Sequence, residues 1–285
     1  MTNEYGNERL HKVLLSALKD IDKICRENDL RYYLHAGTLL GAVNYNGFIP
    51  WDDDADVSMF PDDFRVLQDI IDTEYKGIYF LETYDNTPDY FRKLNKLQII
   101  GADIQYEDGS ISPIFVDISV FHAIPDQKIF RSIQKFKLEF WDKVLSVKSG
   151  AIIPTSIWSK IVLKGMAKIK KDTIGKHLDN IMQKYDKKET ECYALMIHFL
   201  DNPYTGVNGY INDSVPRDIC ENPKYIPFED TEFMVYSNPE IDLIRRYGKD
   251  YCQPYPEEKR ISKHGLISYN ISDEVDKRLK LGVQK

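Results

Sequence analysis

The sequence has only four cysteines, and none of them is paired with another in a recognisable motif. Cys25, Cys192, Cys220 and Cys252 are far apart, without a C-x-x-C pair or a histidine at zinc-finger spacing. This distribution argues against a disulfide framework and against a structural zinc site. We expect reduced thiols, as in a cytoplasmic protein.

The sequence also lacks long apolar runs and an excess of basic residues. No stretch approaches the roughly 18 apolar residues of a membrane span, and the first residues have neither the basic nor the apolar region of a signal peptide. The net charge is −7, whereas contacts with nucleic-acid phosphates need a basic surface. We therefore expect a cytoplasmic protein that binds no nucleic acid.

An acidic cluster between apolar residues is the most informative feature that is present. Residues 47–60 read Gly-Phe-Ile-Pro-Trp-Asp-Asp-Asp-Ala-Asp-Val-Ser-Met-Phe. In a strand, successive side chains alternate between faces, so Asp54 and Asp56 point the same way and can hold one hard cation, Mg²⁺ or Mn²⁺. Asp52 is an outer ligand on the same side, and alternation points Asp53 away. The alternative is a solvated acidic turn.

A further carboxylate, Asp117, lies outside this cluster. It is the one charged residue of a nearly continuous apolar strand, residues 114–121. Such a carboxylate is costly unless it is paired, protonated or bound to a metal. It is therefore a candidate third metal ligand or a catalytic base. The alternative is an edge-strand position in solvent, or an ion pair with a lysine or arginine.

Hydrophobic periodicity predicts alternating helices and strands. The order strand, glycine turn, short helix in the N-terminal region suits the binding of a phosphate. The expected helices are residues 10–28, 39–43, a helix that opens at Pro61, and 241–247; the expected strands are 30–35, 78–84, 96–106 and 114–121, with a tight turn at 36–38.

Residues 129–188 are helical in pattern and rich in lysine. One interpretation is a basic amphipathic surface that touches the inner face of a membrane of anionic lipid. The other is an ordinary packed helix with lysines on its solvent face.

Two motifs resemble the signature of the LicD family, which includes bacterial phosphocholine transferases and the fukutin-related proteins. They are the run Leu-His-Ala-Gly-Thr-Leu-Leu-Gly-Ala-Val from Leu34 and the run Gly-Phe-Ile-Pro-Trp-Asp-Asp-Asp-Ala-Asp-Val from Gly47. The sequence departs from the family at Asn44-Tyr45-Asn46, where an arginine is usual. The resemblance implies an α+β fold with a nucleotidyltransferase-like mixed β-sheet core flanked by helices. Residues 1–150 are then the catalytic core, and residues 151–285 a helical and loop-rich region that packs on it and completes the site.

The resemblance also implies site residues. Asp54, Asp56 and Asp117 occupy the catalytic carboxylate positions and Gly37-Thr38 the phosphate-binding turn. The segment Ile-Pro-Phe-Glu that ends at Glu229 is a further family feature, and it adds Glu229 as a carboxylate that orients the acceptor. Lys93 and Lys96 are candidate cationic contacts to a diphosphate, or else part of a solvated basic loop. Tyr32, Tyr33 and Trp51 are candidates to cage a quaternary ammonium, or else core residues.

The implied reaction is the transfer of a phospho-alcohol group from a CDP-activated alcohol such as CDP-choline to a sugar hydroxyl, with release of CMP. The acceptor is a cell-surface glycan, in the form of lipopolysaccharide, teichoic acid or capsule, or a lipid-linked precursor of one. Three alternatives stay open: a donor such as CDP-ribitol, CDP-glycerol or a CDP-ethanolamine-like compound, a nucleotidyltransferase that uses an NTP, and a catalytically silent glycan-binding module.

Overall fold

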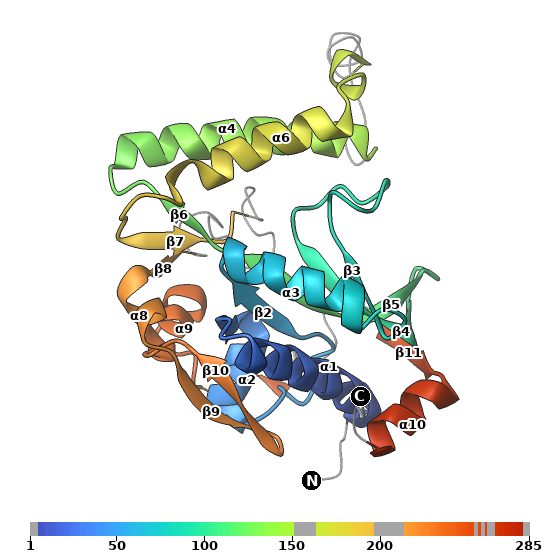
Figure 1. Cartoon of the computed structure of the whole chain (residues 1–285). Coiled ribbons are helices and arrows are strands. Elements are labelled where there is room, and N and C mark those ends of the chain that lie inside the picture. The colour runs from blue at the N-terminus through green and yellow to red at the C-terminus, as the bar shows by residue number, and fades with distance from the viewer. Residues whose placement is uncertain are drawn as a thin grey trace. The chain divides into compact units, whose positions relative to one another are not determined.

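A computed structural model of the chain describes residues 5–150, 164–196, 214–253, 256–257, 260 and 266–281 (Figure 1). The chain forms two compact units, each made of separated segments. The first unit comprises Met1–Glu82, Lys96–Val120 and Glu221–Lys285, and the second comprises Thr83–Asn95 and Phe121–Cys220. The units therefore do not follow the division at residue 150 that the sequence suggests.

A six-stranded mixed sheet forms the centre of the first unit. Its strand order is β1-β2-β5-β4-β11, and β3 pairs with β4. β2 and β5 run parallel, whereas β1 with β2, β3 with β4 and β11 with β4 run antiparallel. The strands are β1 (Tyr32–Leu34), β2 (Asp56–Met59), β3 (Tyr79–Glu82), β4 (Asn95–Tyr106), β5 (Ile111–Val120) and β11 (Leu266–Ile271).

Helices α1 and α3 cover one face of this sheet (Figure 1). Helix α1 (Glu8–Glu27) has an apolar stripe at spacings of three and four, and its side chains from Leu10 to Ile24 on that stripe are at most 1% exposed. Helix α3 (Pro61–Glu74) begins with proline and two acidic residues, which favour a helix N-terminus. The predicted helices and strands of this region are confirmed, and so is the mixed sheet flanked by helices.

The rest of the first unit consists of α2, a hairpin and two C-terminal helices. Helix α2 (Ala36–Tyr45) follows β1, and strands β9 (Lys224–Phe228) and β10 (Thr231–Val235) form an antiparallel hairpin. Helix α9 (Pro239–Tyr247) lies against α2, and α10 (Asp273–Leu281) lies against α1. The prediction of a helix over 241–247 is confirmed.

The second unit contains a three-stranded antiparallel sheet and helices packed on one another. Strands β6 (His122–Ile124), β7 (Cys192–Ala194) and β8 (Ser214–Pro216) form the sheet in that order. The helices are α4 (Lys128–Lys148), α6 (Lys171–Met182), the 3₁₀ turn η1 (Gln183–Tyr185) and α8 (Arg217–Glu221). Leu138 of α4 and Leu178 of α6 meet in its core. The predicted helical region 129–188 is thus largely helix, while its residues 151–163 lie outside the described part of the chain.

No helix within the described residues has both the length and the apolar character needed to cross a membrane.

Candidate active site

The parallel pairing of β2 with β5 brings two of the predicted catalytic carboxylates side by side. Asp56, the first residue of β2, is in register with Asp117 of β5. The pairing is continued just before β2, where the backbone N–H of Asp117 donates to the carbonyl of Ala55 at 2.8 Å. Residues 61 apart in the sequence therefore present neighbouring side chains at one place on the sheet.

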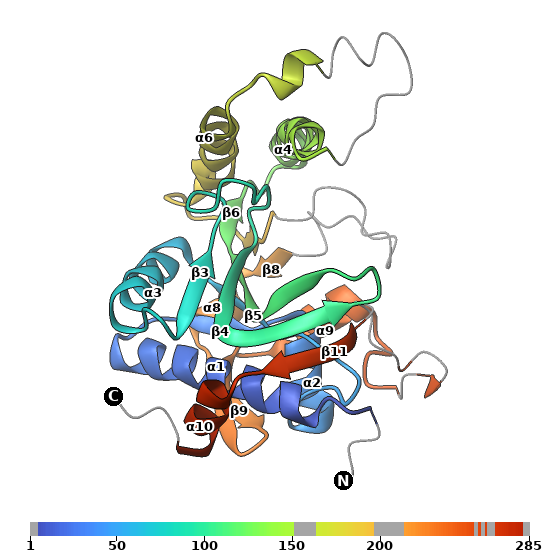
Figure 2. The ribbon, with the colours of Figure 1, turned by 90° about the vertical axis from the view of Figure 1, so that its right-hand side faces the viewer.

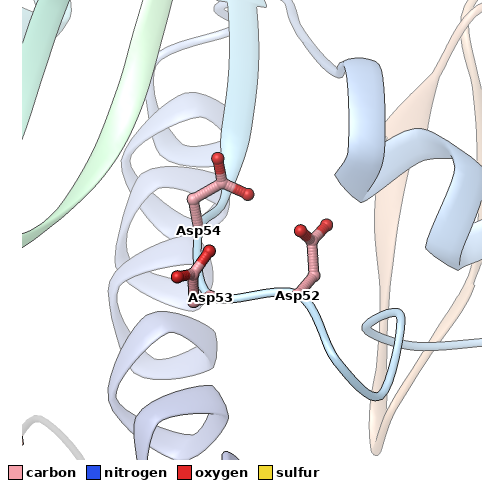
Figure 3. A group of neighbouring side chains, drawn as sticks. All are labelled: Asp52, Asp53 and Asp54. Atoms are coloured by element: carbon pink, nitrogen blue, oxygen red, sulfur yellow. The ribbon is translucent and has the colours of Figure 1, made fainter. Parts of the chain in front are cut away.

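Three further carboxylates lie on the loop that enters β2. Asp52, Asp53 and Asp54 each place one oxygen within 4.8 Å of the others, and Figure 3 shows the three side chains gathered on one side of that loop. The expectation that Asp53 points away is wrong. Strand alternation does not apply to it, because β2 begins only at Asp56 and residues 52–55 are irregular.

The charges of these carboxylates act on the pKa of Asp56. Burial raises the pKa of Asp56 well above its usual value, and the charges of Asp54, Asp117 and Asp52 raise it further, while Arg246 acts in the opposite direction. Charged carboxylates in such a group need a cation to offset them. Carboxylate oxygens are the ligands that Mg²⁺ takes in proteins, so the residues present fit that ion.

Helix α2 begins beside this cluster. His35 is its N-cap, so Gly37 and Thr38 belong to the first turn of the helix and not to a turn before it. A Cβ atom on Gly37 would lie 2.7 Å from Oδ2 of Asp52, so only glycine allows this approach. The positive end of the helix thus faces a carboxylate, and its backbone N–H groups are suited to an anion.

Thr38 has a contact that the sequence does not predict. Its Oγ1 accepts a hydrogen bond of 2.8 Å from the backbone N–H of Asp56, and the side chain is buried. Thr38 therefore ties the first turn of α2 to the first residue of β2. Ala36, two residues before Thr38, has a φ of +45°, a left-handed conformation that is strained for alanine.

Of the two predicted lysines, Lys96 lies at the carboxylates. Its Nζ is 3.7 Å from Oδ1 of Asp117 and 3.2 Å from the centre of the Phe115 ring. Lys93 belongs to the second unit, where its Nζ lies 2.8 Å from Oδ1 of Asp179 and 4.4 Å from the centre of the Tyr84 ring.

Glu229 is placed where it holds the loop before the acidic cluster. It occupies the turn between β9 and β10 with a φ of +54°, and its backbone N–H donates to the carbonyl of Asn46 at 2.7 Å. Its Oε1 accepts a hydrogen bond of 3.1 Å from the backbone N–H of Phe48. A Cβ on Gly47 would overlap that oxygen, so the glycine permits the contact.

Asn7, the N-cap of α1, and His11 of α1 support the same loop, and no sequence pattern predicts either contact. The side-chain amide of Asn7 donates to the carbonyl of Asp52 at 3.0 Å, and Nε2 of His11 lies 2.8 Å from the same oxygen. Because a carbonyl only accepts, Nε2 of His11 carries the proton. Burial lowers the pKa of His11, which keeps the ring neutral. Contacts made through the main chain of Asp52 leave no motif in the sequence.

Helix α9 and strand β4 add three more residues near the carboxylates. Burial raises the pKa of Tyr247, with further increases from Asp56 and Asp52 against the opposing effect of Arg246. Burial likewise raises the pKa of Tyr106 of β4, and Asp53, Asp117 and Asp54 contribute.

Arg246 is oriented by a buried hydrogen-bond network. Its Nη2 donates to Nε2 of His35 at 2.9 Å, because a guanidinium only donates. Nδ1 of His35 then carries the proton and donates to the hydroxyl of Tyr236 at 3.3 Å, which also contacts Oγ of Ser58 at 3.3 Å.

The three residues predicted as a possible aromatic cage are all buried. Tyr32 and Tyr33 are completely buried core residues; Tyr32 donates to Asp22 at 2.7 Å, and Tyr33 stacks on Tyr236 with ring centres 4.7 Å apart. Trp51 makes an edge contact with Tyr45, and the guanidinium of Arg260 lies 5.2 Å from the Trp51 ring centre.

Comparisons with known proteins find relatives that share the region of this site. Residues 29–154 match the family model described as LicD/FKTN/FKRP, nucleotidyltransferase domain. The chain is 26% identical over 266 residues to the protein named lipopolysaccharide cholinephosphotransferase LicD of Haemophilus influenzae, and the match covers 90% of this chain and 95% of that protein. An uncharacterized protein of Rickettsia typhi is 38% identical over 128 residues, which are 45% of this chain and 35% of that protein.

Among solved structures, terminal uridylyl transferase 4 from Trypanosoma brucei with bound GTP is similar to 50% of this chain, over 47% of its own, at 11% identity and a TM-score of 0.22. A score this low carries no argument. The matched segment 29–154 contains α2, the acidic cluster and Asp117, and the similarity to the Haemophilus protein extends over nearly the whole chain. The chain is therefore similar to the LicD family, over residues 29–154 by the family model and over most of its length by the Haemophilus protein.

Proposed function

We propose that this protein is a Mg²⁺-dependent phosphotransferase. It transfers a phospho-alcohol group, with phosphocholine as the first candidate, from a CDP-activated donor to a hydroxyl of a cell-surface glycan such as lipopolysaccharide. The observation that carries the proposal is the gathering of Asp54, Asp56 and Asp117 with Asp52 at the start of α2. The name of the Haemophilus relative supplies the first candidates for donor group and acceptor.

In this reaction the glycan hydroxyl attacks the donor phosphorus that carries the alcohol. A new P–O bond forms to the glycan, the P–O bond to CMP breaks, and a phosphodiester results. Asp52, Asp54 and Asp56 would hold Mg²⁺, which would supply charge neutralisation for the diphosphate and the departing CMP. The N-terminal N–H groups of α2 bind a phosphate oxygen.

Asp117 takes the proton of the attacking hydroxyl in our proposal. It lies beside Asp56 in the sheet register and within 3.7 Å of the Lys96 ammonium. A nearby ammonium favours the charged form of a carboxylate, which is the form that accepts a proton. Arg246, which Nε2 of His35 orients, is a further cation whose charge acts on Asp56, and we assign it to the donor diphosphate.

The first experiment follows CMP release in the presence of Mg²⁺, candidate glycans and a panel of CDP-choline, CDP-ethanolamine, CDP-glycerol and CDP-ribitol. CMP release that depends on the glycan supports the proposal, and the donor that responds identifies the alcohol. Release of pyrophosphate from an NTP would instead make the protein a nucleotidyltransferase. Tight glycan binding without turnover of any donor would make it a binding module.

The carboxylate assignment is tested by Asp54→Asn, which keeps the size of the side chain but removes its charge. We expect transfer to fall at least about a thousandfold, because charge neutralisation of a phosphoryl group provides most of the rate enhancement in such reactions. Asp62→Asn, which removes an exposed carboxylate of α3, is the matched control and should retain full activity. Comparable activity of the two variants would refute the assignment.

A further inference from the structure

Helix α4 carries a row of large apolar side chains on its exposed side. Ile129 is 67% exposed, Ile133 45%, Phe136 70% and Phe140 49%, and the neighbouring Phe130 is 47% exposed. Successive residues of an α-helix are about 100° apart, so Ile129, Ile133, Phe136 and Phe140 fall within an arc of roughly 60°. We call these four residues the α4 stripe.

The α4 stripe is separate from the face that α4 packs into its own unit. The buried side chains are Gln134, Leu138, Val144 and Leu145, and α6 lies against α4 (Figure 2, which views both helices nearly along their axes). Among the residues that the structure describes, helix α4 therefore carries an exposed apolar stripe in addition to the face that it packs into the second unit.

Lysines flank the α4 stripe on both sides. By the same helical geometry, Lys137 lies next to one edge of the stripe and Lys143 next to the other, and both are exposed. An apolar stripe between basic residues is the pattern of helices that lie in a membrane interface, with apolar side chains inserted and lysines at the headgroups.

The charge of this region is opposite to that of the rest of the chain. Residues 128–188 contain 15 Lys and Arg against 5 Asp and Glu, a net charge of +10, whereas the remaining residues sum to −17. An anionic surface is therefore attracted to this segment and repelled by the rest of the chain.

We propose that the α4 stripe is a docking face for an anionic lipid bilayer. Phe136 and Phe140 enter the boundary between headgroups and acyl chains, while Lys137 and Lys143 contact the anionic headgroups. A second copy of the chain is a poorer occupant, because a symmetric dimer through this face would bring two segments of charge +10 together. The docking face is independent of the chemistry assigned to the carboxylates.

The test is co-sedimentation of the full chain with vesicles of phosphatidylcholine, with and without about one third phosphatidylglycerol. We expect binding to the anionic vesicles that weakens as salt rises. We expect Phe136→Ser/Phe140→Ser to weaken this binding by about tenfold or more, since the inserted rings supply the apolar part of it. Lys137→Glu/Lys143→Glu should weaken it to a similar extent.

Matched controls come from the first unit. Ile111→Ser/Ile267→Ser removes two isoleucines that are 70% and 61% exposed, and Lys76→Glu/Lys224→Glu reverses two exposed lysines. Both controls should bind vesicles like the unchanged protein, and circular dichroism should show the same helix content in all variants. Equal binding to neutral vesicles, equal binding by the phenylalanine variant, or self-association that this variant abolishes without any vesicle binding would each overturn the proposal.

Discussion

At the scale of single residues, the buried carboxylate of Asp20 shows how this protein accommodates an acid in its core. Asp20 lies on α1 and is 4% exposed, and its Oδ2 accepts a hydrogen bond from the hydroxyl of Tyr79. Burial raises the pKa of Asp20, while the bond from Tyr79 and the charges of Arg278 and Lys23 lower it. The net direction is upward, so burial outweighs these interactions.

This balance predicts how the stability of an Asp20→Asn variant depends on pH. A folded-state pKa above the unfolded value of about 3.9 means that the native protein binds more protons, so the contribution of Asp20 to stability is lost as pH rises from about 4 through the folded pKa. Asparagine does not titrate and still accepts the bond from Tyr79. The difference in unfolding free energy should therefore shift in favour of the variant, by at most about 1.4 kcal/mol per pH unit.

Urea unfolding of both proteins at intervals between pH 4 and pH 7 measures this difference. In a Tyr79→Phe background the charged Asp20 loses its hydrogen bond, so the same shift should continue to higher pH. A difference that stays constant across the range would show that Asp20 has the same pKa in both states.

At the scale of elements, the β9–β10 hairpin holds the loop that leads to the acidic cluster. Glu229 accepts a hydrogen bond from the N–H of Phe48, and its own N–H donates to the carbonyl of Asn46.

If activity depends on these contacts of Glu229 with the loop, Glu229→Gln should keep most activity, because its amide oxygen still accepts from Phe48. Glu229→Ala should lose activity by about tenfold and unfold at lower temperature, because a buried N–H loses its partner. If instead the charge of Glu229 acts on the acceptor, both variants should be equally impaired in kcat.

Helices and strands with a local sequence pattern could be predicted from the sequence, whereas the start of a strand without such a pattern could not. The apolar stripe of α1 and the Pro-Asp-Asp start of α3 are local patterns, and both helices were predicted. The resemblance supplied the grouping of Asp54, Asp56 and Asp117. Strand alternation failed for Asp53 because no local signal shows that β2 begins at Asp56.

The supporting residues of the site could not be predicted for a different reason. Asn7 and His11 act through a main-chain carbonyl 41 to 45 residues away. Arg246 meets His35 across 211 residues. These contacts leave no periodic pattern or motif in the sequence, because each of them depends on how elements far apart in the chain pack together.

At the scale of the whole molecule, repulsion among the carboxylates of the acidic cluster lowers the stability of the folded chain, and a bound cation offsets this repulsion. The chain has a net charge of −7, and Asp52, Asp54, Asp56 and Asp117 lie close enough to act on one another. A cation that binds only the folded chain stabilises it, by about 2.7 kcal/mol at a concentration 100 times its Kd.

We therefore predict that Mg²⁺ raises the unfolding temperature by about 5 °C relative to EDTA, given the usual dependence of Tm on stability for chains of about this size. Asp56→Asn should be more stable than the unchanged protein in EDTA, since it removes one of the repelling charges, and should show little response to Mg²⁺. Calorimetry with NaCl at matched ionic strength separates this response from general screening. An equal Mg²⁺ response in Asp56→Asn would place the ion elsewhere.

The discontinuous course of the first unit determines when the protein can finish folding during its synthesis. The second unit has all of its residues once residue 220 has left the ribosome, whereas the first unit needs β11 beside β4 and α10 beside α1, where Arg9 pairs with Asp276. Chains grow from the N-terminus and fold by units. The unit that carries the carboxylates is therefore completed after the second unit, once residues 266–281 have left the ribosome.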